Sequence, residues 1–147
     1  MSDTQLPRGI AKGLTNYGDA GFAAYLRRSF IKSMGYTNEA LAKPVVGIAS
    51  TGSGFNNCPR AMPELVEAVK RGVMMAGGLP IEFPTVSLGE VFLSPTSLMF
   101  RNLMAMVTEE MITAQPMDAV VLIGGCDKTV PAQLMGAASA NVPAVQL

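Results

Sequence analysis

The sequence predicts an α/β fold of three layers, in which helices flank a mainly parallel β-sheet. Two features predict it. Short runs of consecutive apolar residues alternate along the chain with longer segments whose apolar residues recur at helical spacing. The short runs lack the apolar–polar alternation of a half-exposed strand, as is typical of parallel strands buried on both faces. Strands alternating with helices favour right-handed β-α-β crossovers and therefore a parallel sheet.

The first half of the chain predicts an arm, two helices and one strand. Residues 1–19 contain several glycines and no sustained periodicity, so we expect an extended arm or loop, followed by the α/β domain over residues 20–147. Residues 20–34 predict a helix because apolar residues recur there every four positions. The run VVGIA at 45–49 predicts a buried strand. A polar loop at 50–57 leads to a helix that begins near Pro63 and ends at Gly77 and Gly78.

The second half continues the alternation. Residues 81–86 predict a strand that Pro84 makes short or places near an edge. A loop at 87–95 precedes a helix at 96–114, and AVVLI at 119–123 is the clearest strand. After two glycines, a helix opens at Pro131 and ends at Asn141, and residues 143–147 begin a fourth strand. A chain that stops within a strand predicts a piece of a longer, two-domain protein.

Composition excludes several classes of function. The eleven basic and eleven acidic residues cancel, which argues against nucleic-acid and membrane-surface partners. No apolar run approaches the roughly 20 residues that span a bilayer, and the first residues lack a signal-peptide pattern, so we expect a cytoplasmic protein. Two cysteines are too few for a disulfide framework. The absence of histidine removes Ser-His-Asp and Cys-His catalysis and histidine zinc sites, leaving carboxylates, lysines, thiols and hydroxyls.

Reactive residue types follow three of the predicted strands. In open α/β sheets, ligands bind at the carboxyl ends of the strands. Cys58 lies beyond the first strand, Glu90 beyond the second, and Cys126, Asp127 and Lys128 beyond the third. Thiolates are soft ligands that suit iron–sulfur clusters or zinc, whereas carboxylates suit magnesium. The residues therefore indicate two unlike metal environments at one edge of the sheet.

Each of these residues also has an ordinary interpretation. Either cysteine can be a small buried apolar residue, and Asp127 or Thr129 can cap the helix that opens at Pro131. Cys126 near a helix N-terminus can instead be a reactive thiolate of lowered pKa. The loop 50–54 can hold a phosphate through its backbone N–H groups, although the usual phosphate-loop patterns are absent. From the residues alone, the ordinary roles outweigh the metal site.

Five segments carry a more specific signal. They are KPVVGIA at 43–49, VKRG at 69–72, AGGLPIEFP at 76–84, GCDKTVP at 125–131 and NVPAV at 141–145. In register from about residue 24 to the end, they resemble the dihydroxy-acid and phosphogluconate dehydratase family. TGS at 51–53 and EFP at 82–84 are more similar to the sugar-acid (aldonate) dehydratases, such as arabinonate dehydratase, than to the enzyme of branched-chain amino-acid biosynthesis.

The resemblance implies a role for each residue of the predicted edge. Cys58 and Cys126 would be ligands of an iron–sulfur cluster, usually 2Fe-2S. Glu90 and Asp127 would bind Mg²⁺, with Lys128 completing that site, in some members as a carbamate, and serving in catalysis. The third cluster cysteine and the serine base of the family lie beyond residue 147, the serine in a second domain.

The implied reaction removes water from a 2,3-dihydroxy carboxylate and yields a 2-keto-3-deoxy acid. Magnesium would hold the carboxylate and the C2 oxygen, while cluster iron would act as a Lewis acid on the C3 hydroxyl. The expected partners are a small hydroxy-acid substrate and, in the full-length protein, further copies as a dimer or tetramer. Without the third thiolate and the base, the isolated chain is expected to be inactive.

The sequence also departs from the family pattern. Gly54 stands where many relatives have an acidic residue, and Pro59 and Arg60 are not the usual residues after the first cysteine. These differences predict an altered cluster environment or altered substrate contacts. Three alternatives stay open: a branched-chain dihydroxy-acid dehydratase, a non-catalytic α/β remnant or binding module, and a thiol-redox protein that uses Cys126.

Overall fold

The computed structural model describes residues 7–147 and contains one sheet of four parallel strands. The strands are β1 (Val45–Ser50), β2 (Leu79–Pro84), β3 (Ala119–Ile123) and β4 (Ala144–Gln146), in the order β2-β1-β3-β4. The α-helices are α1 (Ala20–Lys32), α2 (Asn38–Leu41), α3 (Met62–Met75), α4 (Phe100–Ala114) and α5 (Thr129–Ala140). Short 3-10 turns lie at η1 (Gly9–Ala11), η2 (Asn16–Gly18) and η3 (Glu90–Phe92).

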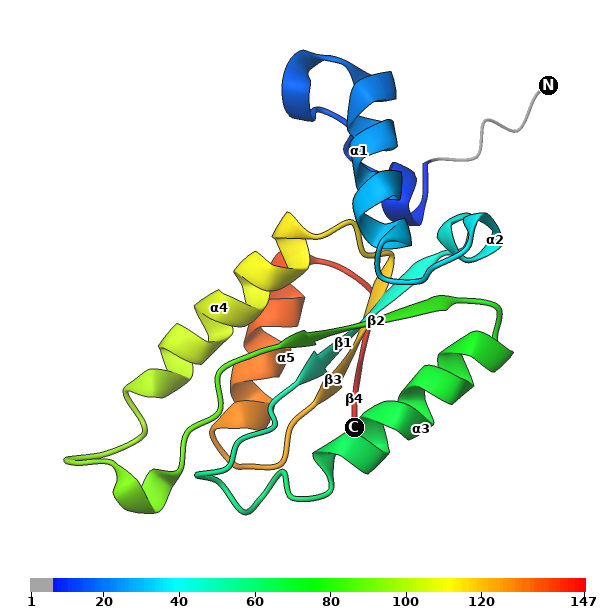
Figure 1. The fold of residues 1–147 in the computed structure, drawn as a ribbon. Coiled ribbons are helices and arrows are strands. Elements are labelled where there is room, and N and C mark those ends of the chain that lie inside the picture. Colours follow the sequence, from blue (N-terminus) through cyan, green and yellow to red (C-terminus); the bar gives the residue numbers. More distant parts are fainter. Residues whose placement is uncertain (1–6) are drawn as a thin grey trace.

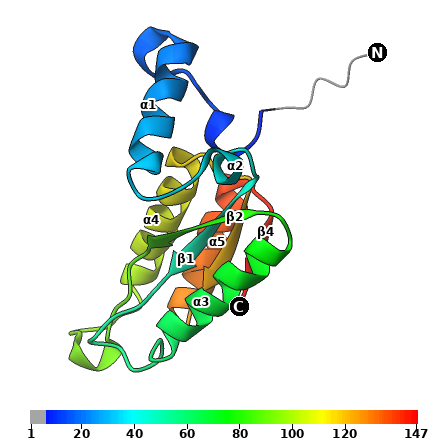
Figure 2. The ribbon, with the colours of Figure 1, turned by 45° about the vertical axis from the view of Figure 1, so that its right-hand side comes forward.

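Helices cover both faces of the sheet, so the predicted three-layer α/β class is confirmed (Figures 1 and 2). On one face, Ile48 and Ile123 pack with Met62 and Val66 of α3. On the other face, Ala49, Val120 and Leu122 pack with Ile112 of α4 and Ala137 of α5. Alternate residues of each strand therefore enter different cores, which explains why the strands are apolar at consecutive positions.

Helices α4 and α5 pack against each other through a glycine. A Cβ atom at Gly136 would lie 2.5 Å from the carbonyl oxygen of Ala105 and 2.8 Å from Cβ of Thr108. Only a residue without a side chain lets the two backbones approach this closely. The close packing fixes α5, and with it the loop between β3 and α5, relative to the sheet.

Several element boundaries differ from those predicted. Strand β2 begins and ends two residues earlier than the predicted 81–86, because pairing with β1 starts at Leu79 opposite Val45. Helix α5 begins at Thr129 rather than Pro131, since proline is tolerated anywhere in a first helical turn. Helix α4 begins at Phe100 rather than Thr96, and α1 ends at Lys32 rather than Met34. Helix α2 and the 3-10 turns were not predicted. The expectation that Pro84 marks an edge strand is confirmed.

The described part of the predicted arm, residues 7–19, contains η1 and η2 and packs on the domain; residues 1–6 lie outside the described part. Asp118, just before β3, accepts hydrogen bonds from the backbone N–H groups of Gly9 (2.7 Å) and Val45 (2.8 Å). Arg27 of α1 donates to the carbonyl oxygens of Ile10 and Gly13. Residues 7–19 therefore lie at the amino end of the sheet, opposite the predicted site (Figure 1).

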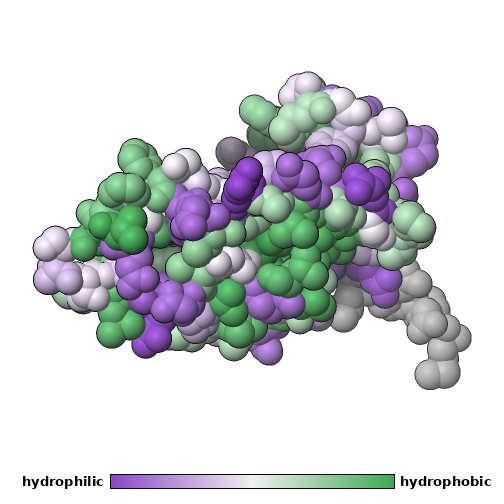
Figure 3. Space-filling model, turned by 90° about the horizontal axis from the view of Figure 1, so that it is seen from below, coloured by the Kyte–Doolittle hydropathy of each residue, from purple (hydrophilic) through white to green (hydrophobic). Residues whose placement is uncertain are grey.

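No helix in residues 7–147 combines the length and the apolar character needed to cross a membrane. Seen from below, the surface shows hydrophobic residues interspersed with hydrophilic ones (Figure 3). Large apolar side chains of the loops at the carboxyl ends of the strands are exposed to solvent, among them Phe55, Val91 and Phe92.

Candidate functional site

The loops that follow β1, β2 and β3 meet at the carboxyl edge of the sheet. The buried hydroxyl of Thr51, directly after β1, donates to the carbonyl oxygen of Ile123 at the end of β3 (3.0 Å). The side-chain amide of Asn56 donates to the carbonyl oxygen of Leu88 (3.0 Å), and its oxygen accepts the backbone N–H of Cys58 (3.0 Å). Residues far apart in the sequence are thus brought together by hydrogen bonds from loop to loop.

The two cysteines are neighbours in this arrangement. A Cβ atom at Gly125 would lie 2.9 Å from the carbonyl carbon of Cys58, so the chain before Cys126 passes directly against the backbone of Cys58. Both thiols are free; Cys58 is exposed and Cys126 is partly buried. Burial raises the pKa of the Cys126 thiol above its ordinary value, and the neighbouring Cys58 thiol acts in the same direction. The structure thus places two thiols side by side.

The carboxylates and the lysine form a second group at the same edge. Nζ of Lys128 donates to Oε1 of Glu90 (2.7 Å) and to Oδ2 of Asp127 (2.8 Å). Hydrogen bonds from Lys128 lower the pKa values of Glu90 and Asp127, and the two carboxylates raise the pKa of Lys128. The Sγ atom of Cys126 lies 3.4 Å from Oδ1 of Asp127, which joins the thiols to the carboxylate group. All five residues predicted from the sequence therefore meet.

The donors fit the implied cofactors in kind. Two adjacent thiols are suitable ligands for cluster iron, and two carboxylates are suitable ligands for Mg²⁺. Within residues 7–147, however, no three His, Cys, Asp or Glu side chains are arranged to hold a metal ion. The ammonium group of Lys128 forms ion pairs with the two carboxylates that a magnesium ion would use and offsets one of their two negative charges. Cation binding between these carboxylates requires Lys128 to move or to lose its charge.

One ordinary interpretation of this loop is wrong. Neither Asp127 nor Thr129 caps α5: the N-cap position is Lys128, which makes no side-chain capping bond, and Thr129 is already helical. The thiol-redox hypothesis stays a prediction, and it expected a lowered pKa at Cys126, whereas the surroundings of this thiol raise its pKa. Burial is the largest influence on that thiol and raises its pKa, outweighing the backbone N–H of Lys128, which lowers it.

Sequence reasoning missed the residues that hold the loops in place. Gln133 of α5 is only 1% exposed, and its amide donates to the carbonyl oxygen of Ile123 (3.3 Å). Gln146 of β4 in turn donates to the side-chain oxygen of Gln133 (3.4 Å). A glutamine inside an otherwise small and apolar helix, TVPAQLMGAASA, was the available signal. Buried polar side chains need hydrogen-bond partners, and here the partners are strand ends.

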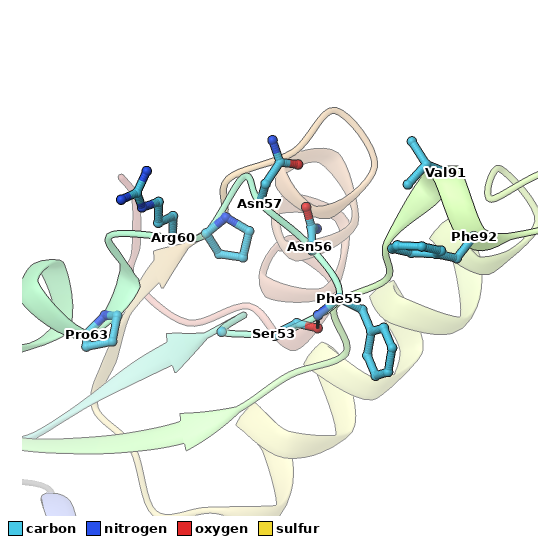
Figure 4. Close-up of a pocket in the computed structure, with 11 residues that line it drawn as sticks. Ser53, Phe55, Asn56, Asn57, Arg60, Pro63, Val91 and Phe92 are labelled. Carbon is cyan, nitrogen blue, oxygen red and sulfur yellow. Dashed lines mark hydrogen bonds between the residues drawn. The ribbon is translucent and has the colours of Figure 1, made fainter.

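A cavity of about 860 Å³ opens beside the cysteine loop (Figure 4). Its polar groups come from Ser53, Asn56, Asn57 and Arg60, and its apolar wall from Phe55, Pro59, Pro63, Val91 and Phe92. The rings of Phe55 and Phe92 meet edge to face with centroids 6.1 Å apart, joining the loops after β1 and β2. Asn57 and Pro59 flank Cys58 in the sequence, so the cavity adjoins the thiol pair.

Comparison with known proteins identifies the family of this chain. The N-terminal domain family of dihydroxy-acid and 6-phosphogluconate dehydratases matches residues 43–147. An L-arabonate dehydratase of Azospirillum brasilense is 47% identical over 122 residues, which cover 82% of this chain and 21% of that protein. A 6-deoxy-6-sulfo-D-gluconate dehydratase of Pseudomonas putida is 43% identical, covering 83% and 21%. A dihydroxy-acid dehydratase of Clostridium novyi is 41% identical, covering 85% and 24%.

These relatives are full-length dehydratases, and the chain spans about a fifth to a quarter of their length. The match covers β1 to β4 and all five residues of the carboxyl edge. This chain belongs to the dihydroxy-acid/6-phosphogluconate dehydratase family and corresponds to its N-terminal domain.

Proposed function

We propose that this chain is the N-terminal part of an iron–sulfur- and magnesium-dependent dehydratase that converts a 2,3-dihydroxy sugar acid to a 2-keto-3-deoxy acid. The observation that carries the proposal is the meeting of Cys58, Cys126, Glu90, Asp127 and Lys128 at one edge of the sheet. The named relatives that act on arabonate and sulfogluconate support a sugar acid as the substrate class. The relative named as a dihydroxy-acid dehydratase supports branched-chain dihydroxy acids as the second candidate.

Each residue has a defined part in this proposal. Cys58 and Cys126 hold the cluster, and Glu90 and Asp127 hold Mg²⁺. When bound, these groups supply Lewis acidity toward hydroxyl and carboxylate oxygens of the substrate. Lys128 forms ion pairs with both carboxylates in the absence of the cation, and in this proposal it serves in catalysis once the cation is bound. The thiols contribute two cluster ligands, so the proposal requires further ligands from outside this chain.

We further propose that the isolated 147-residue chain is inactive, that the full-length protein assembles as a dimer or tetramer, and that it is cytoplasmic. Two thiols do not complete the ligation of the cluster, for which the resemblance implies a third cysteine beyond residue 147. Activity therefore requires a further region of sequence that supplies the remaining cluster ligands and the proton-accepting base.

The test is anaerobic reconstitution of the full-length protein with iron and sulfide, followed by visible absorption and by assay of 2-keto acid formation from aldonates. We expect cluster absorption bands and activity in the wild type, and loss of both in Cys58→Ser and Cys126→Ser. Ser29→Ala, on the exposed side of α1, serves as the control and should keep both. A wild type without cluster bands, or Cys126→Ser with normal bands and activity, would contradict the proposal.

A further inference from the structure

The cavity beside Cys58 contains a cationic group that the proposed reaction does not use. Arg60 is the only charged residue among those that line the cavity. It is exposed, and its guanidinium makes no hydrogen bond or ion pair with any residue in the described range 7–147. The two carboxylates at the same edge of the sheet, Glu90 and Asp127, are paired with Lys128 and not with Arg60. The guanidinium is therefore free to bind oxygen atoms of a ligand.

The other polar groups of the cavity divide into two kinds. The amide of Asn56 is used within the protein, since it holds Leu88 and Cys58. The side chain of Asn57 has no hydrogen-bond partner among residues 7–147, and in Figure 4 it extends from the loop on the same side as Arg60. Asn57 and Arg60 lie on either side of Cys58 and Pro59. The unused donors thus bracket the residue that we propose as a cluster ligand.

The chemistry of the cavity matches one end of a sugar acid. Its volume lies within the range of roughly 300–1,000 Å³ that is usual for ligand pockets. Guanidinium and amide groups donate hydrogen bonds to hydroxyl or oxyanion oxygens, while the Phe92, Val91 and proline wall contacts carbon-bound hydrogens. An alkyl end, as in a branched-chain dihydroxy acid, offers no oxygen atom to the guanidinium, so its hydrogen-bond donors contribute nothing to binding that ligand.

We propose that Arg60 is a specificity-determining residue, which binds the oxygen-bearing distal end of the substrate in this cavity and selects sugar acids over branched-chain dihydroxy acids. This inference rests on the proposed function, because it presumes that the reacting carbons lie at the adjacent thiol and carboxylate groups. The oxygens bound by Arg60 belong either to chain hydroxyls, as in a pentonate, or to a terminal oxyanion, as in a 6-phospho or 6-sulfo sugar acid.

The experiment compares kcat/KM of the reconstituted full-length protein and its Arg60→Met variant on three substrates: L-arabinonate, 6-phospho-D-gluconate and 2,3-dihydroxy-3-methylbutanoate. We expect Arg60→Met to lower kcat/KM for the preferred sugar acid by about 10–100-fold, mainly through KM, because a hydrogen-bonded site rejects ligands that it cannot pair. The branched-chain substrate should change by less than about threefold. A larger loss of kcat/KM for L-arabinonate would show that Arg60 binds chain hydroxyls. A larger loss for 6-phospho-D-gluconate would show that it binds a terminal oxyanion.

Two further variants separate specificity from folding. Arg60→Lys keeps the charge and should recover part of the lost kcat/KM. Arg71→Met removes an exposed arginine of α3 that does not line the cavity, and it should leave kcat/KM unchanged for every substrate. Cluster absorption must be the same in all variants, because a merely structural role of Arg60 would alter it.

The inference fails alone if the wild type dehydrates sugar acids and Arg60→Met leaves the ratio between sugar-acid and branched-chain kcat/KM unchanged. A wild type that holds a cluster but dehydrates none of the three substrates overturns the proposed function, and the inference with it. The two failures are distinguished by the activity of the wild type.

Discussion

Gly125 shows how a single residue positions the candidate site. A side chain there would meet backbone rather than the flexible end of another side chain: its Cβ would lie 2.9 Å from both the carbonyl carbon and oxygen of Cys58, and 3.1 Å from the nitrogen of Pro59. The backbone of Gly125 does not have a positive φ, so the need for glycine is steric. The loops carrying the two cysteines can approach only because this position has no side chain.

We predict that Gly125→Ala separates these loops and lowers the free energy of unfolding by about 1–3 kcal/mol, the usual penalty of overpacking. Chemical denaturation of the chain measures the change. Gly54→Ala is the matched control, because a Cβ atom at Gly54 meets nothing within 4 Å. Equal stability of the two variants would show that the Cys58 backbone can yield without penalty.

At the scale of elements, an ion-pair group joins α3 to the edge strand β2. Nζ of Lys70 in α3 lies 2.8 Å from Oε1 of Glu67 in the same helix and 3.0 Å from Oε2 of Glu82 in β2. The hydrogen bond from Lys70 lowers the pKa of Glu67, and those to Glu67 and Glu82 raise the pKa of Lys70. The ion pair joins α3 to β2, whose one strand neighbour within residues 7–147 is β1.

The signs of these shifts define a pH window. The lowered pKa of Glu67 gives stabilisation that is complete above the ordinary glutamate value of about 4.3 and is lost as pH falls through the lowered value. The raised pKa of Lys70 gives stabilisation that is complete below about pH 10.4 and is lost as pH rises through the raised value.

We predict that Lys70→Met raises the midpoint of the Glu67 carboxyl titration, measured by NMR. Lys43→Met should leave it unchanged, and an unshifted midpoint in Lys70→Met would exclude the contact.

The sequence pattern predicted the bounds of some elements and not of others. Strand β3 was predicted with its observed bounds because AVVLI is apolar throughout and lies between Asp118 and two glycines. At β2 and α5, prolines near the start of the element led to boundaries that differ from those predicted. Pro80 and Pro84 both lie within β2, which an edge strand tolerates, and Pro131 lies within the first turn of α5. In both places the start of the element depends on its packing partner rather than on its own residues.

For the molecule as a whole, Asp118 ties together three parts of the chain. Besides accepting the N–H groups of Gly9 and Val45, its carboxylate lies 3.6 Å from Nζ of Lys12. Lys12 also donates to the carbonyl oxygen of Met117. The segment 7–19 is therefore anchored at the amino end of the sheet. The candidate site lies at the opposite, carboxyl end.

We predict that Asp118→Ala leaves two backbone N–H groups without their acceptor and lowers the free energy of unfolding by about 1–3 kcal/mol. Amide hydrogen exchange at Gly9 and Val45 should accelerate, while cluster reconstitution in the full-length protein should be retained. Glu110→Ala, an exposed carboxylate of α4, is the control. Unchanged exchange at Gly9 would show that the segment is held by its apolar contacts alone.

The sequence by itself determined the alternation of strands and helices, the parallel sheet, and the placement of Cys58, Glu90, Cys126, Asp127 and Lys128 beyond strand ends. These follow from local patterns of apolar residues and from the rule that parallel strands end at one edge. Only the tertiary structure decided that Lys128 forms ion pairs with both carboxylates, that Asn56 and Gln133 hold the loops together, and that Arg60 lines a cavity. Each of these depends on contacts between segments that are distant in the sequence, and a local sequence pattern does not predict which side chains form such contacts.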